Sequence, residues 1–297
     1  MSSSAQRAFS QRPVLVVALG GNALAPPIAG VDHYQRERDI VAQTGAAMAQ
    51  LASSRYRLVI VHGNGPQVGR LLQSDPDPDP NRSNLDIHVA QTQGELGYLL
   101  MAAINAPTAC LLTRVVVEPE LGPPVKPIGP ILDSAPAAPA QATQVAGGWR
   151  IVVPSPQPVS IVELDAISEL LQTHHVIAGG GGGVPLSASG EAVSAVVDKD
   201  WVASLLAVEL GAEHVIFATD VDGVYANFGT RNAKHLDRLS TSQARRLLQN
   251  DQLAAGSMAP KVASASQFAT ATGRTAHICA LRDIQTTLAG ASGTVVA

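Results

Sequence analysis

The chain has 297 residues, of which 20 are basic and 24 acidic, for a formal net charge of −4 without a basic run; this excludes a nucleic-acid partner held through its phosphates. A hydrophobic content of 46% at this low net charge excludes disorder along the whole chain. Two cysteines exclude a disulfide framework and a zinc-spaced cluster, so we expect a soluble protein of a reducing compartment such as the cytoplasm.

The N-terminal segment resembles a signal peptide in outline, because Arg7 and Arg12 precede the apolar run 14–19. This run is short for a signal peptide, and Gly20-Gly21-Asn22 interrupts it, so a buried strand ending in a glycine turn fits better. Elsewhere, no uninterrupted apolar stretch reaches the ~18 residues that a membrane helix needs. We therefore expect no membrane association.

Short apolar runs alternate with helical patterns along the chain. Strands are predicted at 14–19, 58–61, 109–117, 175–178, 215–218 and 275–280, and helices at about 33–53, 85–104, 199–210 and from 262. A short helix is expected after the turn 63–66. Continuous apolar strands separated by helices indicate an α/β fold whose mostly parallel sheet is covered on both faces.

Two proline-rich stretches break this rhythm. Residues 75–80 alternate Asp with Pro and are predicted to form an exposed loop. Residues 118–158 are dense in Pro, Ala and Gly, which fits either a linker between lobes or a small excursion that carries a functional group. Lys126, within Lys126-Pro-Ile-Gly-Pro130, favours the second interpretation.

Three glycine-rich turns follow predicted strands: Gly20-Gly21-Asn22, Gly63-Asn64-Gly65 and Gly179 to Gly183. Glycine at the carboxyl end of a strand lets backbone N–H groups approach phosphate or carboxylate oxygens, so the three turns together indicate an anionic ligand. The chain has no G-x-x-x-x-G-K-[ST] and no G-x-G-x-x-G motif. The pattern 63–69 is one residue too long for the second, and a dehydrogenase stays as an alternative.

Lysine is scarce: only Lys126, Lys199, Lys234 and Lys261 occur, and all other basic residues are arginine. Lys199 follows the candidate N-cap Asp198 and precedes Asp200, and Lys261 follows Pro260 at a predicted helix start. A lysine at a helix N-terminus opposes the helix dipole, which indicates an anion to bind. Three lysines in such positions suit phosphoryl transfer, which needs positive groups around the transferred phosphoryl.

A further acidic turn, Thr219-Asp-Val-Asp-Gly-Val-Tyr225, follows the predicted strand 215–218. Its two carboxylates and its aromatic ring fit a metal site or a nucleobase and ribose pocket, and also an ordinary acidic turn.

Several of these segments together resemble the carbamate kinases within the amino-acid kinase family. The matching segments are, in family order, 18–23, 62–69, 92–98, 126–130, 153–156, 178–182, 198–200, 219–225 and 256–261. The resemblance runs from about residue 13 to 297. In this group Ala18 stands where many other amino-acid kinases have a lysine, and Lys126 is thought to replace that lysine.

The resemblance implies an open αβα sandwich with a small protruding subdomain at about 118–158. It implies an N-terminal lobe, 13–178, for carbamate or carbamoyl phosphate, and a C-terminal lobe, 179–297, for the nucleotide. The implied reaction is ATP + carbamate ⇌ ADP + carbamoyl phosphate, run toward ATP in arginine or ureide breakdown. ATP and ADP are then substrates, Mg²⁺ is held mainly by the nucleotide, and the enzyme is a cytoplasmic homodimer.

The resemblance also implies roles for individual residues. The catalytic group is Lys126, Lys199, Asp200 and Lys261. The substrate-binding group is Gly20, Gly21, Asn22, Gly63, Asn64, Gly65, Gly180 and Gly181. The nucleotide-binding group is Lys199, Thr219, Asp220, Asp222, Tyr225, Ser257, Met258 and Lys261, and no residue is expected to be a dedicated metal ligand.

Two other hypotheses remain beside an active carbamate kinase and the dehydrogenase. One is a non-catalytic paralogue that binds a nucleotide or metabolite, and the other is a kinase for a different small carboxylic acid. The protruding segment lacks acidic and aromatic residues that are common there, which bears on how it closes over the substrate.

Overall fold

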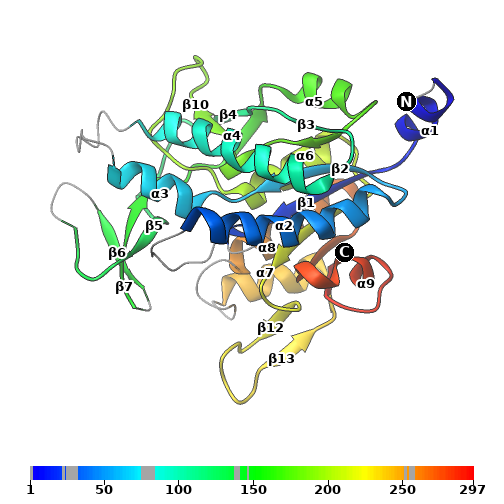
Figure 1. The fold of residues 1–297 in the computed structure, drawn as a ribbon. Helices are drawn as coiled ribbons and strands as arrows, with labels where there is room; N and C mark the ends of the chain where they lie inside the picture. Colours follow the sequence, from blue (N-terminus) through cyan, green and yellow to red (C-terminus); the bar gives the residue numbers. More distant parts are fainter. Residues whose placement is uncertain are drawn as a thin grey trace.

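A central eight-stranded sheet organises the molecule, and helices cover both of its faces (Figure 1). The computed structural model describes residues 3–21, 24, 33–74, 84–136, 141–145, 147–250, 253 and 258–297. The strands of this sheet are β1 (Val14–Leu19), β2 (Arg57–His62), β3 (Thr108–Cys110), β9 (His175–Ile177), β11 (His214–Thr219), β14 (Arg238–Leu239), β15 (Ala276–Ala280) and β16 (Thr294–Val296). Their order is β14-β16-β15-β11-β1-β2-β9-β3. Only β15 and β16 pair antiparallel within it, which confirms the predicted α/β class.

Strand β1 shows how the sequence builds the layers. All six of its residues are buried, since alternate side chains point to opposite faces and each face is covered. Val14, Val16 and Ala18 pack with α5 (Leu164–Leu170), α6 (Lys199–Glu209), α7 (Thr241–Gln249) and α8 (Met258–Thr272). The residues between them pack with α2 (His33–Ala52), α4 (Leu85–Ile104) and α9 (Ile284–Leu288).

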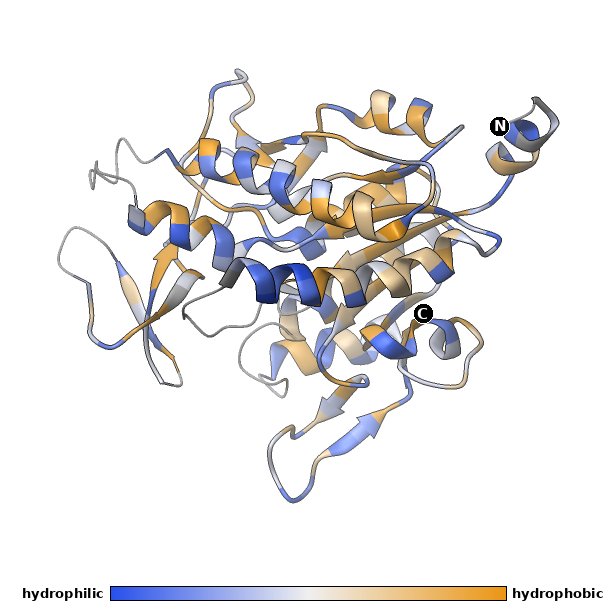
Figure 2. Ribbon diagram, in the orientation of Figure 1, coloured by the Kyte–Doolittle hydropathy of each residue, from blue (hydrophilic) through white to orange (hydrophobic). Residues whose placement is uncertain are grey.

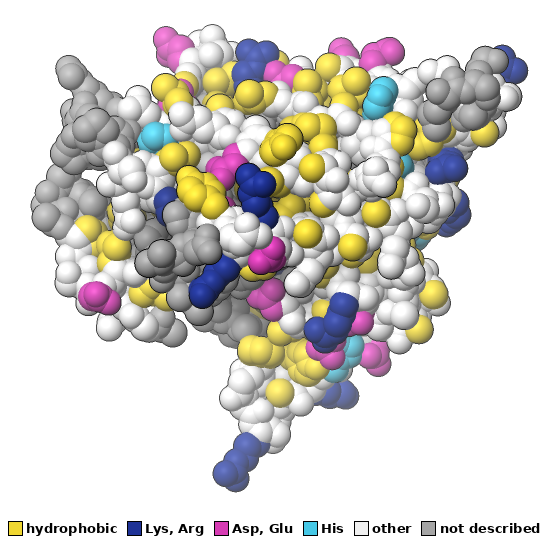
Figure 3. Space-filling model, in the orientation of Figure 1, with side chains coloured by type: hydrophobic (Ala, Val, Ile, Leu, Met, Phe, Trp, Pro, Cys, Tyr) yellow, Lys and Arg dark blue, Asp and Glu magenta, His cyan; other side chains and the backbone are white. Residues whose placement is uncertain are grey.

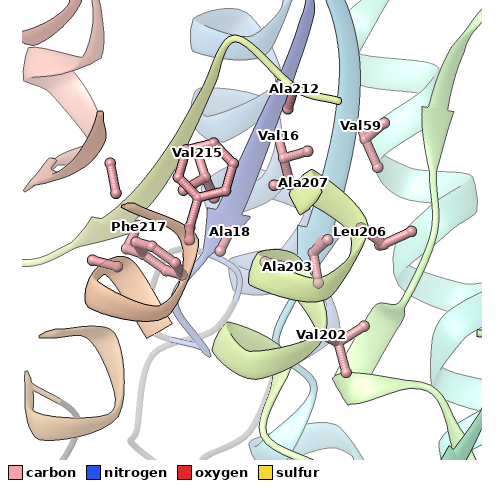
Figure 4. Close-up of a cluster of buried hydrophobic side chains, with 14 of the residues drawn as sticks. Val16, Ala18, Val59, Val202, Ala203, Leu206, Ala207, Ala212, Val215 and Phe217 are labelled. Atoms are coloured by element: carbon pink, nitrogen blue, oxygen red, sulfur yellow. The ribbon is translucent and has the colours of Figure 1, made fainter. Parts of the chain in front are cut away.

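The side chains of the first of these layers are drawn in close-up in Figure 4. Val16 and Ala18 lie against Ala203 and Ala207 of α6, with Phe217 of β11 beside them. Figure 2 shows the same organisation as hydropathy, because the central strands are apolar while the first turns of α2 are hydrophilic. Two short helices complete the fold, α1 (Ser3–Ser10) and α3 (Gly65–Ser74).

Three smaller sheets extend the body. One contains β4 (Arg114–Val117), β8 (Pro158–Ile161) and β10 (Val184–Leu186), and another is the hairpin of β12 (Val224–Ala226) and β13 (Lys234–Leu236). The third is formed by β5 (Lys126–Leu132), β6 (Ala142–Val145) and β7 (Gly148–Val153), and it protrudes from the body beside α3 (Figure 1). The proline-rich segment is therefore an excursion with its own antiparallel sheet, which we call the subdomain.

The predicted strand at 109–117 is wrong in one respect, because the chain forms two strands there, β3 and β4, in different sheets. Between them the Thr113 nitrogen donates to the Gln93 side chain at 2.8 Å, and the Thr113 carbonyl accepts from it at 3.1 Å. The Gln93 side chain thus binds the backbone at the junction of the two strands, where the Thr113 carbonyl also accepts the N–H of Val184 of β10 at 2.9 Å.

Helix α8 also differs from the prediction, since it begins at Met258 rather than at 262. Pro260 therefore lies in the first turn, where the missing N–H has no helical partner to lose. The loop predicted at 75–80 lies outside the described residues.

No described helix is long and apolar enough to cross a membrane. On the face shown in Figure 3, basic side chains are scattered among acidic and apolar ones and do not form a continuous patch.

A close contact between two glycines joins the subdomain to α3. A Cβ atom on Gly69 would lie 1.7 Å from the Cα of Gly129, which has φ +73° and sits at an irregularity of the β5–β7 pairing. Gly69 is therefore needed for backbone packing, and this explains the pattern at 63–69 without a dinucleotide.

We expect Gly69→Ala to lower the melting temperature and to displace β5, because the added methyl overlaps backbone and not a flexible side chain. Gly94→Ala in α4 is the matched control, since its Cβ meets nothing within 4 Å outside the helix and alanine favours a helix by about 1 kcal/mol. Thermal unfolding of both variants checks this. Equal or higher stability of Gly69→Ala would show that the contact is not tight.

Three buried histidines make the fold sensitive to acid. Burial lowers the pKa of His62, His175 and His277 to about 4 in each case, and His277 also feels the neighbouring His214. His175 is held neutral by a specific bond, because its Nδ1 accepts the N–H of Leu58 at 3.0 Å.

The contribution of these three neutral histidines to the unfolding free energy should be fully present above pH 6.5. It should fall as the pH decreases toward 4. In that window the unfolded chain binds more protons than the native one. Each histidine can therefore lower the unfolding free energy by about 1.4 kcal/mol for every unit by which its pKa is shifted. Thermal unfolding followed by circular dichroism between pH 7.5 and 5 measures this. His277→Gln should make the dependence shallower, and a flat profile in the native protein would contradict the expectation.

Candidate active site

Four of the predicted site segments lie at the carboxyl ends of strands in the central sheet. Residues 20–21 follow β1, residues 63–65 follow β2, residues 179–183 follow β9, and residues 220–222 follow β11, which ends at Thr219. These four strands are parallel neighbours, so their carboxyl ends meet. In open α/β sheets these carboxyl ends are where ligands bind.

The first two glycine turns touch each other and the side chain of Lys199. A Cβ atom on Gly63 would lie 3.1 Å from the Gly21 nitrogen and 3.4 Å from Cδ of Lys199. Gly20 donates its N–H to the carbonyl of Ala218 at 3.2 Å, which ties the first turn to the end of β11. The aliphatic part of Lys199 therefore lies against the second turn, at Gly63, while Asn22 lies outside the described residues.

A buried carboxylate joins two of the four lysines. Asp200 accepts from Lys199 Nζ at 2.8 Å with one oxygen and from Lys261 Nζ at 3.0 Å with the other. The side chain of Lys261 is only 2% exposed and that of Asp200 only 3%. Because both lysines lie in the first turns of their helices, the N-termini of α6 and α8 meet at this carboxylate.

The third lysine reaches the same place from the subdomain. Lys126, the first residue of β5, forms an ion pair with Asp198 Oδ2. The other oxygen of Asp198 accepts the N–H of Asp200 at 2.9 Å and caps α6, which confirms the predicted N-cap. The structure thus brings together all four residues that were predicted to be catalytic, and Lys234 stands apart on β13.

The charges of this cluster control one another. Burial alone would raise the pKa of Asp198, but Lys126 and Lys199 outweigh burial and hold it well below its usual range. Burial lowers the pKa of Lys199, but Asp200 and Asp198 outweigh that and raise it. The pKa of Lys261 is lowered, by burial and by Lys199. Three lysines face two aspartates, which leaves one positive charge for an anion to neutralise.

Helix ends add to this positive potential. The N-termini of α6 and α8 meet at Asp200, and α3 begins at Gly65, next to the turn that contacts Lys199. Unpaired N–H groups and the helix dipole attract phosphate and carboxylate groups at such ends. The cluster therefore suits an anion with several oxygens.

The five consecutive glycines have a packing role that the sequence did not reveal. All five are buried, and four of them have positive φ. A Cβ on Gly180 would lie 2.5 Å from Nε2 of His62, and one on Gly181 would lie 2.0 Å from Nδ2 of Asn64. His62 is the last residue of β2 and Asn64 lies in the turn after it, so this glycine segment packs against the end of β2 and the Gly63–Gly65 turn.

Thr92 of α4 supports the same turn, since its Oγ1 accepts from Asn64 Nδ2 at 2.9 Å. His62, Thr92 and Gln93 are residues around the site that sequence reasoning did not assign. The available signal was that Thr92 and Gln93 fall within the recognised segment 92–98, and that His62 directly precedes the second glycine turn.

The residues predicted to hold a nucleotide form a second cluster after β11. Tyr225 donates to Asp222 Oδ1 at 2.9 Å, and its ring meets the edges of His235 at 5.0 Å and Phe228 at 5.8 Å between centroids. Phe228, which the sequence analysis did not single out, is 48% exposed. An exposed aromatic surface beside carboxylates is suited to a base and a ribose.

The remaining nucleotide candidates are less fully described. Thr219 ends β11, Asp220 follows it, and Met258 is the buried first residue of α8. Ser257 lies outside the described residues. Within the described ranges, no group of three or more His, Cys, Asp or Glu side chains is placed to hold a metal ion.

Comparison with known proteins bears on this site. The model of the amino acid kinase family matches residues 13–280. A carbamate kinase of Halobacterium salinarum is 39% identical, over 95% of this chain and 97% of its own length. The chain belongs to the amino acid kinase family, among the carbamate kinases. A carbamate kinase of Escherichia coli K12 is also 39% identical, over 95% of this chain and 98% of its own length.

The fold agrees with a solved member of the carbamate kinases. The enzyme from Giardia lamblia bound to AMP-PNP is 30% identical, with a TM-score of 0.85 that covers 97% of this chain and 99% of that one. The predicted αβα architecture with its protruding subdomain is thereby confirmed.

Proposed function

We propose that this chain transfers a phosphoryl group between ATP and carbamate, as a carbamate kinase. The observation that carries the proposal is the convergence of Lys126, Lys199 and Lys261 on two aspartates, at the edge where the glycine turns meet. Phosphoryl transfer asks for little covalent chemistry from the protein. It asks for positive groups that stabilise the charge of the transferred phosphoryl and for in-line placement of the donor and the acceptor.

Each lysine has a distinct place in this scheme. Lys199 and Lys261 neutralise oxygens of the phosphoryl group during transfer, and Asp200 fixes both ammonium groups by its two hydrogen bonds. Lys126 approaches from the subdomain and adds the third positive charge. A compact ammonium suits this role because it is a point charge that can follow the phosphoryl between its two partners.

The two halves of the chain divide the substrates. Residues 13–178 contribute β1, β2, β3 and β9 to the sheet, and residues 179–297 contribute β11, β14, β15 and β16. We assign carbamate and carbamoyl phosphate to the first lobe, on Gly20, Gly21, Asn22, Gly63, Asn64 and Gly65, with Gly180 and Gly181 completing the cradle from the start of the second lobe. The second lobe would hold the nucleotide on Thr219, Asp220, Asp222, Tyr225, Ser257 and Met258, together with Lys199 and Lys261.

Magnesium is assigned to the nucleotide rather than to a protein cage. Both oxygens of Asp198 and both of Asp200 already bind lysine or backbone N–H groups, which fits an ion carried in on phosphates. When bound, Mg²⁺ would neutralise phosphate charge.

ATP formation from ADP, Mg²⁺ and carbamoyl phosphate tests the proposal. The purified protein should form ATP in a luciferase-coupled assay, and acetyl phosphate in place of carbamoyl phosphate should give much less. A folded protein that forms no ATP would contradict the function. Nucleotide-induced thermal stabilisation without turnover would indicate a binding paralogue, and faster turnover of another acyl phosphate would indicate a kinase for a different acid.

We further propose a cytoplasmic homodimer that works toward ATP in arginine or ureide catabolism. Carbamate decomposes to ammonia and carbon dioxide in water, which removes this product and favours the direction toward ATP. Two free cysteines support a reducing location.

Tyr98 of α4 and Leu112 beyond the edge strand β3 are more than half exposed, which supports a dimer through this edge strand. Light scattering on the full chain tests the dimer.

A further inference from the structure

Asp198 is a buried carboxylate at the centre of the site whose two oxygens serve different parts of the molecule. Oδ1 accepts the N–H of Asp200 at 2.9 Å and caps α6, and Oδ2 pairs with Lys126 of the subdomain. The partners Lys126 and Asp198 are 72 residues apart in the sequence. One side chain therefore connects the first residue of β5 to the helix start that carries Lys199 and Asp200.

The base of the subdomain is fixed by packing, but the end of the Lys126 side chain is not. Ile128 is buried with Val68, Val89 and Val196 of the body. Val125, in contrast, is 63% exposed, and the side chain of Lys126 is 31% exposed. A lysine side chain has several rotatable bonds and loses considerable entropy when it is held. A specific anchor at Nζ is needed to keep the ammonium at the cluster.

We infer that Asp198 is the positioning residue for Lys126, which it holds beside Lys199 and Lys261 before the phosphoryl group enters. The inference rests on the proposed function. Asp198 does not itself act on the reacting atoms; it keeps the Lys126 ammonium at the N-terminus of α6, where the phosphoryl oxygens are expected. Its negative charge is the part that matters for this role, whereas its oxygen alone suffices for the helix cap.

Asparagine at this position separates the two roles. It is as good an N-cap as aspartate, so Asp198→Asn keeps the bond to Asp200 and removes only the charge. We expect kcat to fall about 10²-fold, as for a displaced catalytic group, with a much smaller change in KM for ADP. In a Lys126→Ala background the same substitution should lower kcat far less, because only the weaker interaction of Asp198 with Lys199 is then left to lose.

Ser240→Ala is the matched control for the loss of a cap. Ser240 caps α7 away from the site and accepts the N–H of Gln243 at 3.1 Å. This variant should lower the melting temperature by ~2–4 °C and leave kcat unchanged. If Asp198→Asn lowers kcat equally with and without Lys126, or does not lower it at all, the positioning role is overturned.

The scarcity of lysine allows a second test that does not depend on turnover. Labelling with ¹⁵N-lysine produces side-chain ammonium signals from only four residues, and the Lys126 signal is the one missing in Lys126→Ala. Asp198→Asn should shift or broaden that signal and leave the Lys234 signal unchanged. An unchanged Lys126 signal would overturn the anchor. An inactive wild-type enzyme that still shows the shift would contradict the proposed function and not the contact.

Discussion

Lys126→Ala is expected to lower kcat by about 10²- to 10³-fold, the usual cost of removing one group that stabilises transition-state charge. The effect on folding should be small, because Lys126 is the most exposed of the three site lysines and pairs of partly exposed charges contribute about 1 kcal/mol or less. Asp198 keeps its cap of α6 and its proximity to Lys199 in the variant. The coupled ATP-formation assay and a thermal melt of the same sample measure both effects.

Lys234→Ala is the matched control for this prediction. Lys234 lies on the exposed hairpin of β12 and β13 and has no ion pair among those of the described residues, so its loss should leave kcat and the melting temperature unchanged. A loss of kcat below about threefold in Lys126→Ala would mean that the subdomain does not supply a catalytic group. A large drop in melting temperature that accompanies the loss of activity would mean that Lys126 is structural.

The parts of the fold that follow from local pattern could be predicted. Strand β1 is six apolar residues, five of them at full burial and Val14 close to it, and its register with β2 and β11 extends along its length. Helix α4 occupies the residues predicted for it, 85–104, and the polar residues Asn84 and Asn105 flank it in the structure. Such features depend on residues that are close together in the sequence, so the sequence of one protein is enough to predict them.

The features that escaped depend on contacts between distant segments. The junction between β3 and β4 is bound by Gln93, twenty residues earlier on another element. Gly180 and Gly181 pack against His62 and Asn64, and no pattern in the sequence connects these glycines to those two side chains. Composition singled out the site lysines because they are rare, but which carboxylate each one meets is decided by how α6, α8 and β5 come together.

Asp200→Ala is expected to have the largest combined effect, on both stability and turnover. The substitution leaves the ammonium groups of Lys199 and Lys261 in a site where their side chains are 12% and 2% exposed, without the carboxylate that binds both. Breaking a buried ion pair from one side costs about 3–5 kcal/mol, because the remaining charge stays desolvated. Urea unfolding should show this loss, and kcat should fall with it because neither ammonium is then fixed.

A compensating variant separates the two effects. Asp200→Ala combined with Lys261→Met removes one buried positive charge along with the carboxylate, so much of the lost unfolding free energy should return. Turnover should not return, since a phosphoryl oxygen would then face one positive group fewer and an unfixed Lys199. If the double variant is no more stable than Asp200→Ala, the loss comes from packing around Asp200; if it recovers activity, Lys261 does not contact the transferred group.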